Sequence, residues 1–170
     1  DRQLQKACTG ADGYTFEPLL EALSGSLQSD LNLATLENLV IVNEKLSDVN
    51  MPSDALTAIR ASGFNVLCNG FPGVLSSGVT GLTTTMSAIS KAGITPYGAY
   101  ASQEARKHVT TLQTNGTTVA LLSYQSELTS ASKKNSSTEE QQYVIAPLTL
   151  PTIATDISAA RAAGAQIVIV

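Results

Sequence analysis

Apolar residues along the chain follow two spacings that alternate. Before each of three Gly residues, apolar side chains repeat every three to four positions, as on one face of a helix. Directly after each of these Gly residues, a short apolar run follows. The three units are Ala61-Ser62-Gly63 before FNVLC, Lys91-Ala92-Gly93 before ITPYG, and Ala162-Ala163-Gly164 before AQIVIV. Because Gly is typical of a helix C-cap with positive φ, each unit predicts a helix that leads straight into a strand.

The predicted helices each carry one apolar face. The faces consist of Leu56 and Ile59, of Leu82, Met86 and Ile89, and of Ile153, Ile157 and Ala160. An earlier helix, over residues 15–27, presents Phe16, Leu19, Leu20, Leu23 and Leu27, and the segment DLNLATLENL after it is a predicted strand. Helices that alternate with short strands rich in Val, Ile and Leu are typical of a largely parallel sheet. The predicted fold class is therefore α/β, with helices on the faces of a layered sheet.

The second half of the chain departs from this pattern. Asn115-Gly116, between residues 108–114 and 117–124, is a two-residue sequence typical of a tight β-hairpin. We therefore predict an antiparallel pair over residues 108–114 and 117–124. Residues 126–142 are rich in Ser, Thr, Lys, Glu and Gln, and we interpret them as a long exposed loop within one domain.

Composition and charge exclude several classes of protein. The hydrophobic fraction of 43% and the charged fraction of 14% predict a packed core rather than disorder. No apolar run approaches the roughly 20 residues that span a bilayer, so we expect no membrane-spanning segment here. The net charge of -4 comes without a dense Lys/Arg stripe, which argues against nucleic acid as a partner.

The ends of the chain carry a further expectation. The chain starts at Asp1 without Met and stops at Val170, directly after an apolar run that we predict to be a central strand. We expect a single domain over residues 1–170 that is incomplete at both ends, so a targeting segment at the start can have been removed.

The residues able to bind metal are few. Cys8 and Cys68 are too far apart for a CxxC motif, and the sequence leaves open whether they pair or whether Cys68 is a buried thiol. With one His in the chain, a His-rich metal site cannot be built from these residues alone.

Five segments follow one another in an order that carries a resemblance. They are DLNLATLENL, NMPSDALTAIRASGFNVL, GVTGLTTTMSAISKAGITPYGA, TLQTNGTTVALLSY and DISAARAAGAQIVIV. Over about residues 14–170 the chain resembles the CapA family of bacterial capsule-synthesis proteins, which are associated with poly-γ-glutamate. The resemblance implies a fold similar to calcineurin-like metallophosphatases, an extracytoplasmic position at the cell envelope, and a full-length protein with a membrane anchor.

The chain departs from the family at the metal-site motif. The family's Asn-Asn-His-x-x-Asp run corresponds to residues 71–76, where Gly73 stands for the His and Ser76 for the Asp. Neither can replace an imidazole or an ionised carboxylate as a ligand of a divalent cation. Thr35 stands for the Asn of the family's Asn-Leu-Glu motif, while the acid is kept as Glu37. The resemblance thus implies a degenerate metal site, and we expect no metal or other cofactor.

The candidate site residues follow the predicted strands, because ligands of parallel α/β sheets bind beyond the carboxyl ends of strands. Glu37 is the one catalytic candidate, although a Glu at a strand end is also typical of a solvated or capping residue. The ligand-binding candidates are Glu37, Asn38, Asn69, Gly73, Ser76 and Tyr124, with Glu127 beside them. We interpret His108 as a surface residue.

Three functions are compatible with these residues. The first is a non-catalytic accessory or polymer-binding domain whose partner is an anionic polymer or an envelope protein. The second is a metal-dependent phosphoesterase-like hydrolase whose site is completed by segments outside this chain, and it predicts an open acidic cleft around Glu37. The third is a purely structural domain, which would be favoured if Phe71, Pro72 and Leu75 filled the cleft.

Overall fold

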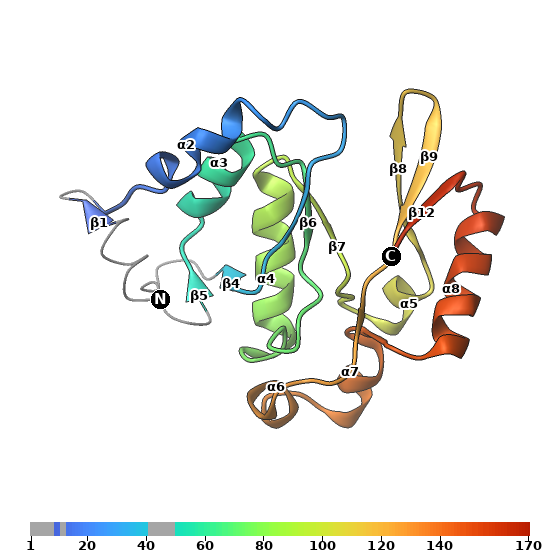
Figure 1. Ribbon diagram of the computed structural model, residues 1–170. Helices are drawn as coiled ribbons and strands as arrows, with labels where there is room; N and C mark the ends of the chain where they lie inside the picture. The colour runs from blue at the N-terminus through green and yellow to red at the C-terminus, as the bar shows by residue number, and fades with distance from the viewer. Residues whose placement is uncertain (1–8, 11–12, 41–49) are drawn as a thin grey trace.

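The computed structural model describes residues 9–10, 13–40 and 50–170, and Figure 1 shows its helices and strands. One sheet consists of three parallel strands in the order β3-β6-β7. These strands are β3 (Leu33–Thr35), β6 (Val66–Cys68) and β7 (Thr95–Tyr97). The helices α3 (Asp54–Ala61) and α4 (Gly78–Lys91) cover its outer face, where Leu67 packs in one cluster with Leu56 and Ile89.

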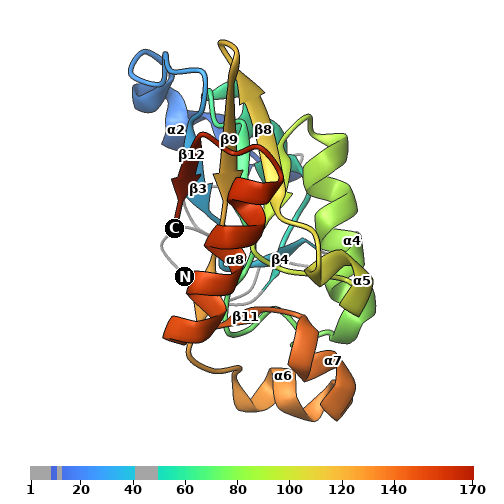
Figure 2. The same cartoon turned by 90° about the vertical axis from the view of Figure 1, so that its right-hand side faces the viewer.

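A second sheet has the order β12-β9-β8. Its strands are β8 (Thr110–Thr114), β9 (Thr117–Leu121) and β12 (Ile167–Ile169), with β8 antiparallel and β12 parallel to β9. The hairpin turn at Asn115 and Gly116 is confirmed, with φ of 48° and 76°. The helix α8 (Leu150–Ala162) packs on this sheet, with Ala160 and Ala120 in one cluster. Figure 2 shows this helix in front of β9.

The inner faces of the two sheets pack against each other. Because successive side chains of a strand point to opposite faces, Val66 turns away from Leu67 and joins a cluster with Val119 and Leu121 of the second sheet. Figure 1 accordingly shows α4, the first sheet, the second sheet and α8 in succession. The α/β class is confirmed, and the finer likeness to metallophosphatases stays a prediction.

The glycines at the predicted helix ends have the backbone that a C-cap requires. Gly63, Gly93 and Gly164 have φ of 111°, 74° and 89°, a region that side-chain-bearing residues rarely adopt. Each lies between a helix and the strand that follows it in the sheet, as the sequence pattern predicts.

The first described part of the chain is less regular than predicted. It contains β1 (Thr9–Gly10), β2 (Gly13–Tyr14), α2 (Glu17–Ser24), β4 (Leu39–Val40) and β5 (Asn50–Met51). The helix is shorter than the predicted residues 15–27, and of its apolar face Phe16 is buried whereas Leu19 and Leu23 are about two-fifths exposed. The predicted strand over DLNLATLENL is split into β3 and β4.

The prediction of a long loop over residues 126–142 is wrong. This segment contains α6 (Ser130–Lys134) and α7 (Thr138–Tyr143), and the short parallel strands β10 (Tyr124–Gln125) and β11 (Ala146–Pro147) flank it. Thr129 caps α6 by accepting a hydrogen bond from the Ser132 backbone, and Ser137 and Glu140 form a capping box at α7. Such caps satisfy the free backbone N–H groups at the first turn of a helix. The polar residues of this segment therefore belong to capped helices rather than to a loop.

Candidate functional site

The carboxyl ends of β6, β7 and β9 meet at one place between the two sheets. The Cys68 thiol donates a hydrogen bond to Ser123 Oγ over 3.2 Å, and so joins the end of β6 to the residues after β9. Gly98, directly after β7, lies against both of these side chains. The Gln125 amide donates to the Gly70 carbonyl oxygen over 2.9 Å. Cys68 is a free, buried thiol, while Cys8 lies outside the described residues.

The two candidates that follow β3 lie next to this place. The Leu36 backbone N–H donates to the Cys68 carbonyl oxygen over 2.8 Å, so the residues after β3 run beside those after β6. Glu37 is exposed. Asn38 is half-buried and lines an apolar cavity of about 480 Å³ together with Phe16, Leu19, Leu20, Leu36, Met51, Ala55 and Ile59. The structure thus places Glu37 and Asn69 after neighbouring strands, but turns Asn38 toward an apolar cavity.

Asn69 is a buried polar residue without a hydrogen-bond partner for its side chain. It is fully buried, and its backbone N–H donates to the Tyr97 carbonyl oxygen over 2.8 Å. Neither the oxygen nor the nitrogen of its side-chain amide makes a hydrogen bond to the residues that the structure describes. Since an unpaired buried amide costs folding free energy, this side chain calls for a functional or solvent partner.

Residues 71–76, the predicted counterpart of the CapA metal motif, contribute to the core. Phe71, Val74 and Leu75 are buried in a cluster whose other members are Leu39, Leu82, Ala99, Leu128, Val144 and Ile145. Two of these, Leu128 and Val144, flank α6 and α7. Phe71 and Leu75 are therefore core residues, whereas Glu37 is exposed.

Hydrogen bonds hold the helix α6 against this segment. Ser132 Oγ donates to the Pro72 carbonyl oxygen over 3.0 Å and accepts from the Leu75 N–H over 3.2 Å. The Asn135 side-chain amide donates to the Ser76 carbonyl oxygen over 2.6 Å. Candidate Ser76 is thus held through its backbone by a residue that lies directly after α6.

The described residues do not fit a metal ion. Among residues 9–10, 13–40 and 50–170, no group of three or more His, Cys, Asp or Glu side chains is placed to hold one. A Cβ added at Gly73 would lie 2.7 Å from Phe71 Cε2, so the aromatic ring occupies the space that a ligand side chain at position 73 would need.

Tyr124 belongs to a buried cluster that the sequence did not reveal. Two hydrogen bonds from the Arg106 guanidinium, of 3.2 Å and 2.8 Å, reach the two carboxylate oxygens of Asp156. The Arg106 guanidinium also lies 5.1 Å from the centre of the Tyr100 ring. The sequence signals this cluster only through Asp156, an acidic residue on the apolar face of α8, one turn before Ala160.

The charges of this cluster follow from its burial. Burial lowers the pKa of Arg106, but the hydrogen bond and negative charge of Asp156 raise it more, so the net shift is upward. Burial raises the pKa of Tyr124, and the nearby Asp156 carboxylate raises it further. Within the part of the chain that the structure describes, the Tyr124 hydroxyl has no hydrogen-bond partner, and at neutral pH it stays protonated because its pKa is raised.

Tyr97 gives a prediction for alkaline pH. Burial, followed by its contact with Cys68, raises the pKa of Tyr97 from 10.0 to about 12. The folded protein therefore holds this proton more tightly than the unfolded chain does, and the stability it contributes is lost as pH rises from about 10 to about 12. Urea unfolding of wild type and Tyr97→Phe is to be measured across this pH range. We expect the free energy of unfolding to fall less steeply with pH in the variant than in wild type. Parallel curves would contradict the assignment.

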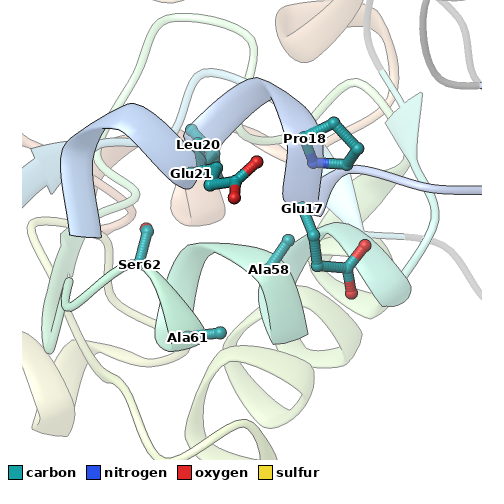
Figure 3. A pocket seen from close by; sticks show the side chains of 7 residues that line it. All are labelled: Glu17, Pro18, Leu20, Glu21, Ala58, Ala61 and Ser62. Carbon is teal, nitrogen blue, oxygen red and sulfur yellow. The ribbon is translucent and has the colours of Figure 1, made fainter.

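Several grooves are present on the described surface, and two of them lie beside α2 and beside α6 and α7. Figure 3 shows one of about 370 Å³ between α2 and α3, with the Glu17 and Glu21 side chains on one wall and Ala58, Ala61 and Ser62 on the other. The second, which we call the α6–α7 groove, has about 460 Å³ and is lined by Gln125, Ser126, Glu127, Leu128, Lys133, Gln141, Gln142, Ile145 and Pro147. The second groove borders the strand ends, because Gln125 is hydrogen bonded to Gly70.

A comparison with models of protein families assigns the chain to one family. The family model described as bacterial capsule synthesis protein PGA_cap matches residues 1–170, the whole chain. The chain belongs to this family. No curated protein matches it.

Membership of the PGA_cap family confirms the resemblance to capsule-synthesis proteins that the order of the five segments indicates. In this family member, no helix of the described residues is long and apolar enough to cross a membrane.

The remaining candidates of this PGA_cap protein lie on its surface. His108 is exposed and lies 3.6 Å from Glu104, so its interpretation as a surface residue is confirmed. Glu127 is exposed too and lies 3.8 Å from Lys133, at the mouth of the α6–α7 groove.

Proposed function

We propose that this PGA_cap domain acts in capsule synthesis without catalysis, as an accessory domain that binds an anionic capsule polymer or an envelope protein. The burial of Phe71, Val74 and Leu75 beneath α6 and α7 argues against a hydrolase but is equally compatible with a purely structural domain. The observation that carries the proposal is therefore the α6–α7 groove, which borders the strand ends and is lined by polar side chains. A hydrolase of this family would need an imidazole and a carboxylate where Gly73 and Ser76 stand. Packing and hydrogen bonds have taken the place of ligands along this segment.

The α6–α7 groove is the binding surface that supports this proposal. The amide nitrogens of Gln125 and Gln141 donate to backbone carbonyl groups, at 2.9 Å from Gly70 O and 3.1 Å from Lys133 O. Anchored in this way, each glutamine offers its carbonyl oxygen as an acceptor to an amide N–H of a polymer. Lys133 provides a cation for a carboxylate, so the groove combines the two groups that an acidic, amide-linked chain requires.

Binding of labelled poly-γ-glutamate, followed by fluorescence anisotropy, tests this proposal. Lys133→Ala is expected to weaken binding about two- to fivefold, and binding should weaken as salt is raised. Lys107→Ala is the matched control, because Lys107 is also an exposed lysine paired with a glutamate, but it lies on another part of the surface. Equal losses in both variants would point to unspecific attraction, and no binding at all would leave an envelope protein as the partner.

The second candidate function is a metal-dependent hydrolase completed by segments outside this chain. It is favoured because Glu37 and Asn69 follow the neighbouring strands β3 and β6, and the Asn69 side-chain amide has no hydrogen-bond partner among the described residues. Elemental analysis for Mn, Fe and Zn on a protein extended at both ends, with Glu37→Ala as the control, decides between the two. A stoichiometric metal that disappears in the variant, together with phosphoester hydrolysis, would overturn the non-catalytic proposal. We expect a metal-free protein.

The proposed place of action is outside the cytoplasm, at the cell envelope. The support is membership of the capsule-synthesis family, because capsule polymers are assembled at the cell surface. A tagged full-length protein that partitions with envelope fractions would agree with this place, whereas a cytoplasmic protein would contradict it.

A further inference from the structure

The tip of the β8–β9 hairpin makes a contact that joins the two halves of the fold. The Asn115 side-chain amide donates a hydrogen bond to Asp30 Oδ2 over 2.7 Å. Asp30 belongs to the segment that leads into β3, and its carbonyl oxygen accepts from the Asn65 side chain over 2.6 Å. In Figures 1 and 2 the hairpin tip and this segment lie at the end of the molecule away from α6 and α7.

The Asn65 side chain extends this contact into the first sheet. Its amide oxygen accepts from the Asn32 backbone N–H over 2.8 Å, directly before β3. The side-chain amide of Asn32 in turn donates to the Gly63 carbonyl oxygen over 3.1 Å. A chain of hydrogen bonds therefore runs from the hairpin tip to the start of β3 and the end of α3, and Asn115 is its exposed end.

Asn115 also has the chemical surroundings in which an asparagine side chain is lost. It is exposed to water, and the residue after it is Gly116, which has no side chain to shield the backbone nitrogen. A Cβ at Gly116 would meet nothing within 4 Å, so the turn has free space around it. An unhindered backbone nitrogen after asparagine is the nucleophile that attacks the side-chain amide.

We propose that Asn115 is a site of spontaneous deamidation, and that its loss converts the contact with Asp30 from attraction to repulsion. The Gly116 nitrogen attacks Asn115 Cγ, a C–N bond forms, and the Cγ–Nδ2 bond breaks with release of ammonia. Solvent water then opens the five-membered ring, which leaves aspartate or isoaspartate. In total, one amide and one water give one carboxylic acid and one ammonia, with no change of oxidation state.

The modified side chain cannot keep its bond to Asp30. The amide donates a hydrogen bond, whereas a carboxylate at neutral pH only accepts, and Asp30 offers only acceptors as well. Two like charges would then lie where one hydrogen bond was, and they repel each other by an amount similar to that of an exposed ion pair. The hairpin tip would separate from the segment before β3.

Peptide mapping by mass spectrometry tests the chemistry on the folded protein. During incubation in mildly alkaline buffer, the peptide with Asn115 is expected to gain aspartate and isoaspartate with time. Asn135 is the internal control, because it is also exposed and hydrogen bonded through its amide, but Ser136 follows it. An unmodified Asn115, or equal modification of both sites, would overturn the proposal.

Substitutions that change the charge at positions 115 and 30 test the expected repulsion separately from the deamidation chemistry. Asn115→Asp is expected to raise the equilibrium constant of unfolding about two- to fivefold. Adding Asp30→Asn should recover most of this loss, because an amide at position 30 could then donate to the new carboxylate. Wild-type stability in Asn115→Asp, or no recovery in the double variant, would contradict the repulsion.

Discussion

Replacing Asp156 by Ala is expected to lower the free energy of unfolding by about 3 kcal/mol. The Arg106 and Asp156 side chains are only 20% and 11% exposed, so removal of the carboxylate leaves a largely buried guanidinium without its two hydrogen bonds. Most of the loss comes from this unpaired charge rather than from the attraction itself. The cluster also ties α5 (Gln103–Arg106) to α8, so we expect the change to loosen both helices.

Urea unfolding measures this effect, and the chain offers a matched control. Glu104 forms an ion pair of 2.7 Å with Lys107, but both side chains are about two-thirds exposed. Glu104→Ala is therefore expected to cost at most about 0.5 kcal/mol. A similar small loss in Asp156→Ala would show that the buried pair contributes little.

Replacing Gly70 by Ala is expected to cost about 3 kcal/mol or to prevent folding, because overpacking against backbone cannot be relieved by a side-chain rotation. A Cβ at this position would lie 2.3 Å from the Gly98 carbonyl oxygen. Gly70 follows β6 and Gly98 follows the neighbouring strand β7, so the ends of these two strands would have to move apart.

Gly25→Ala is the control for this substitution. A Cβ at Gly25 would meet nothing within 4 Å, and its φ of -76° suits any residue. We expect Gly25→Ala to leave the thermal midpoint unchanged or slightly higher. A folded Gly70→Ala protein of wild-type stability would show that the strand ends are less tightly packed than the structure describes.

The parts of the fold that depend on neighbouring residues were predictable from sequence. Helix C-caps at Gly63, Gly93 and Gly164 and the turn at Asn115 need a particular backbone conformation, which few residue types allow. The pairing of strands within each sheet follows from the alternation of helices and strands. Local constraints of this kind leave a clear trace in the sequence.

The helices α6 and α7 show where composition misleads. Their polar residues suggested a loop, although Ser137 and Glu140 have the spacing of a capping box. Both helices are short, and what holds them is contact with the core through Leu128, Ser132 and Val144. Such tertiary contacts override the propensity of a segment, and one sequence alone does not record them.

The candidate site was predictable in its place but not in its contacts. Glu37 and Asn69 do follow neighbouring strands, because parallel strands bring their carboxyl ends to one edge. The pairing of Arg106 with Asp156 joins residues 50 positions apart. The burial of Phe71 likewise depends on helices far along the chain. Whether the candidates bind a ligand stays a prediction.

The packing of Phe71 over Gly73 limits the side chains that position 73 can accept. A mutation of Gly73 to His would by itself place the new side chain against the aromatic ring, 2.7 Å from the first added carbon. Phe71 would have to change first, and that change alone would remove a buried side chain from the core and cost stability. Residues 71 and 73 are therefore coupled, so selection acting on one mutation at a time tends to retain both of them.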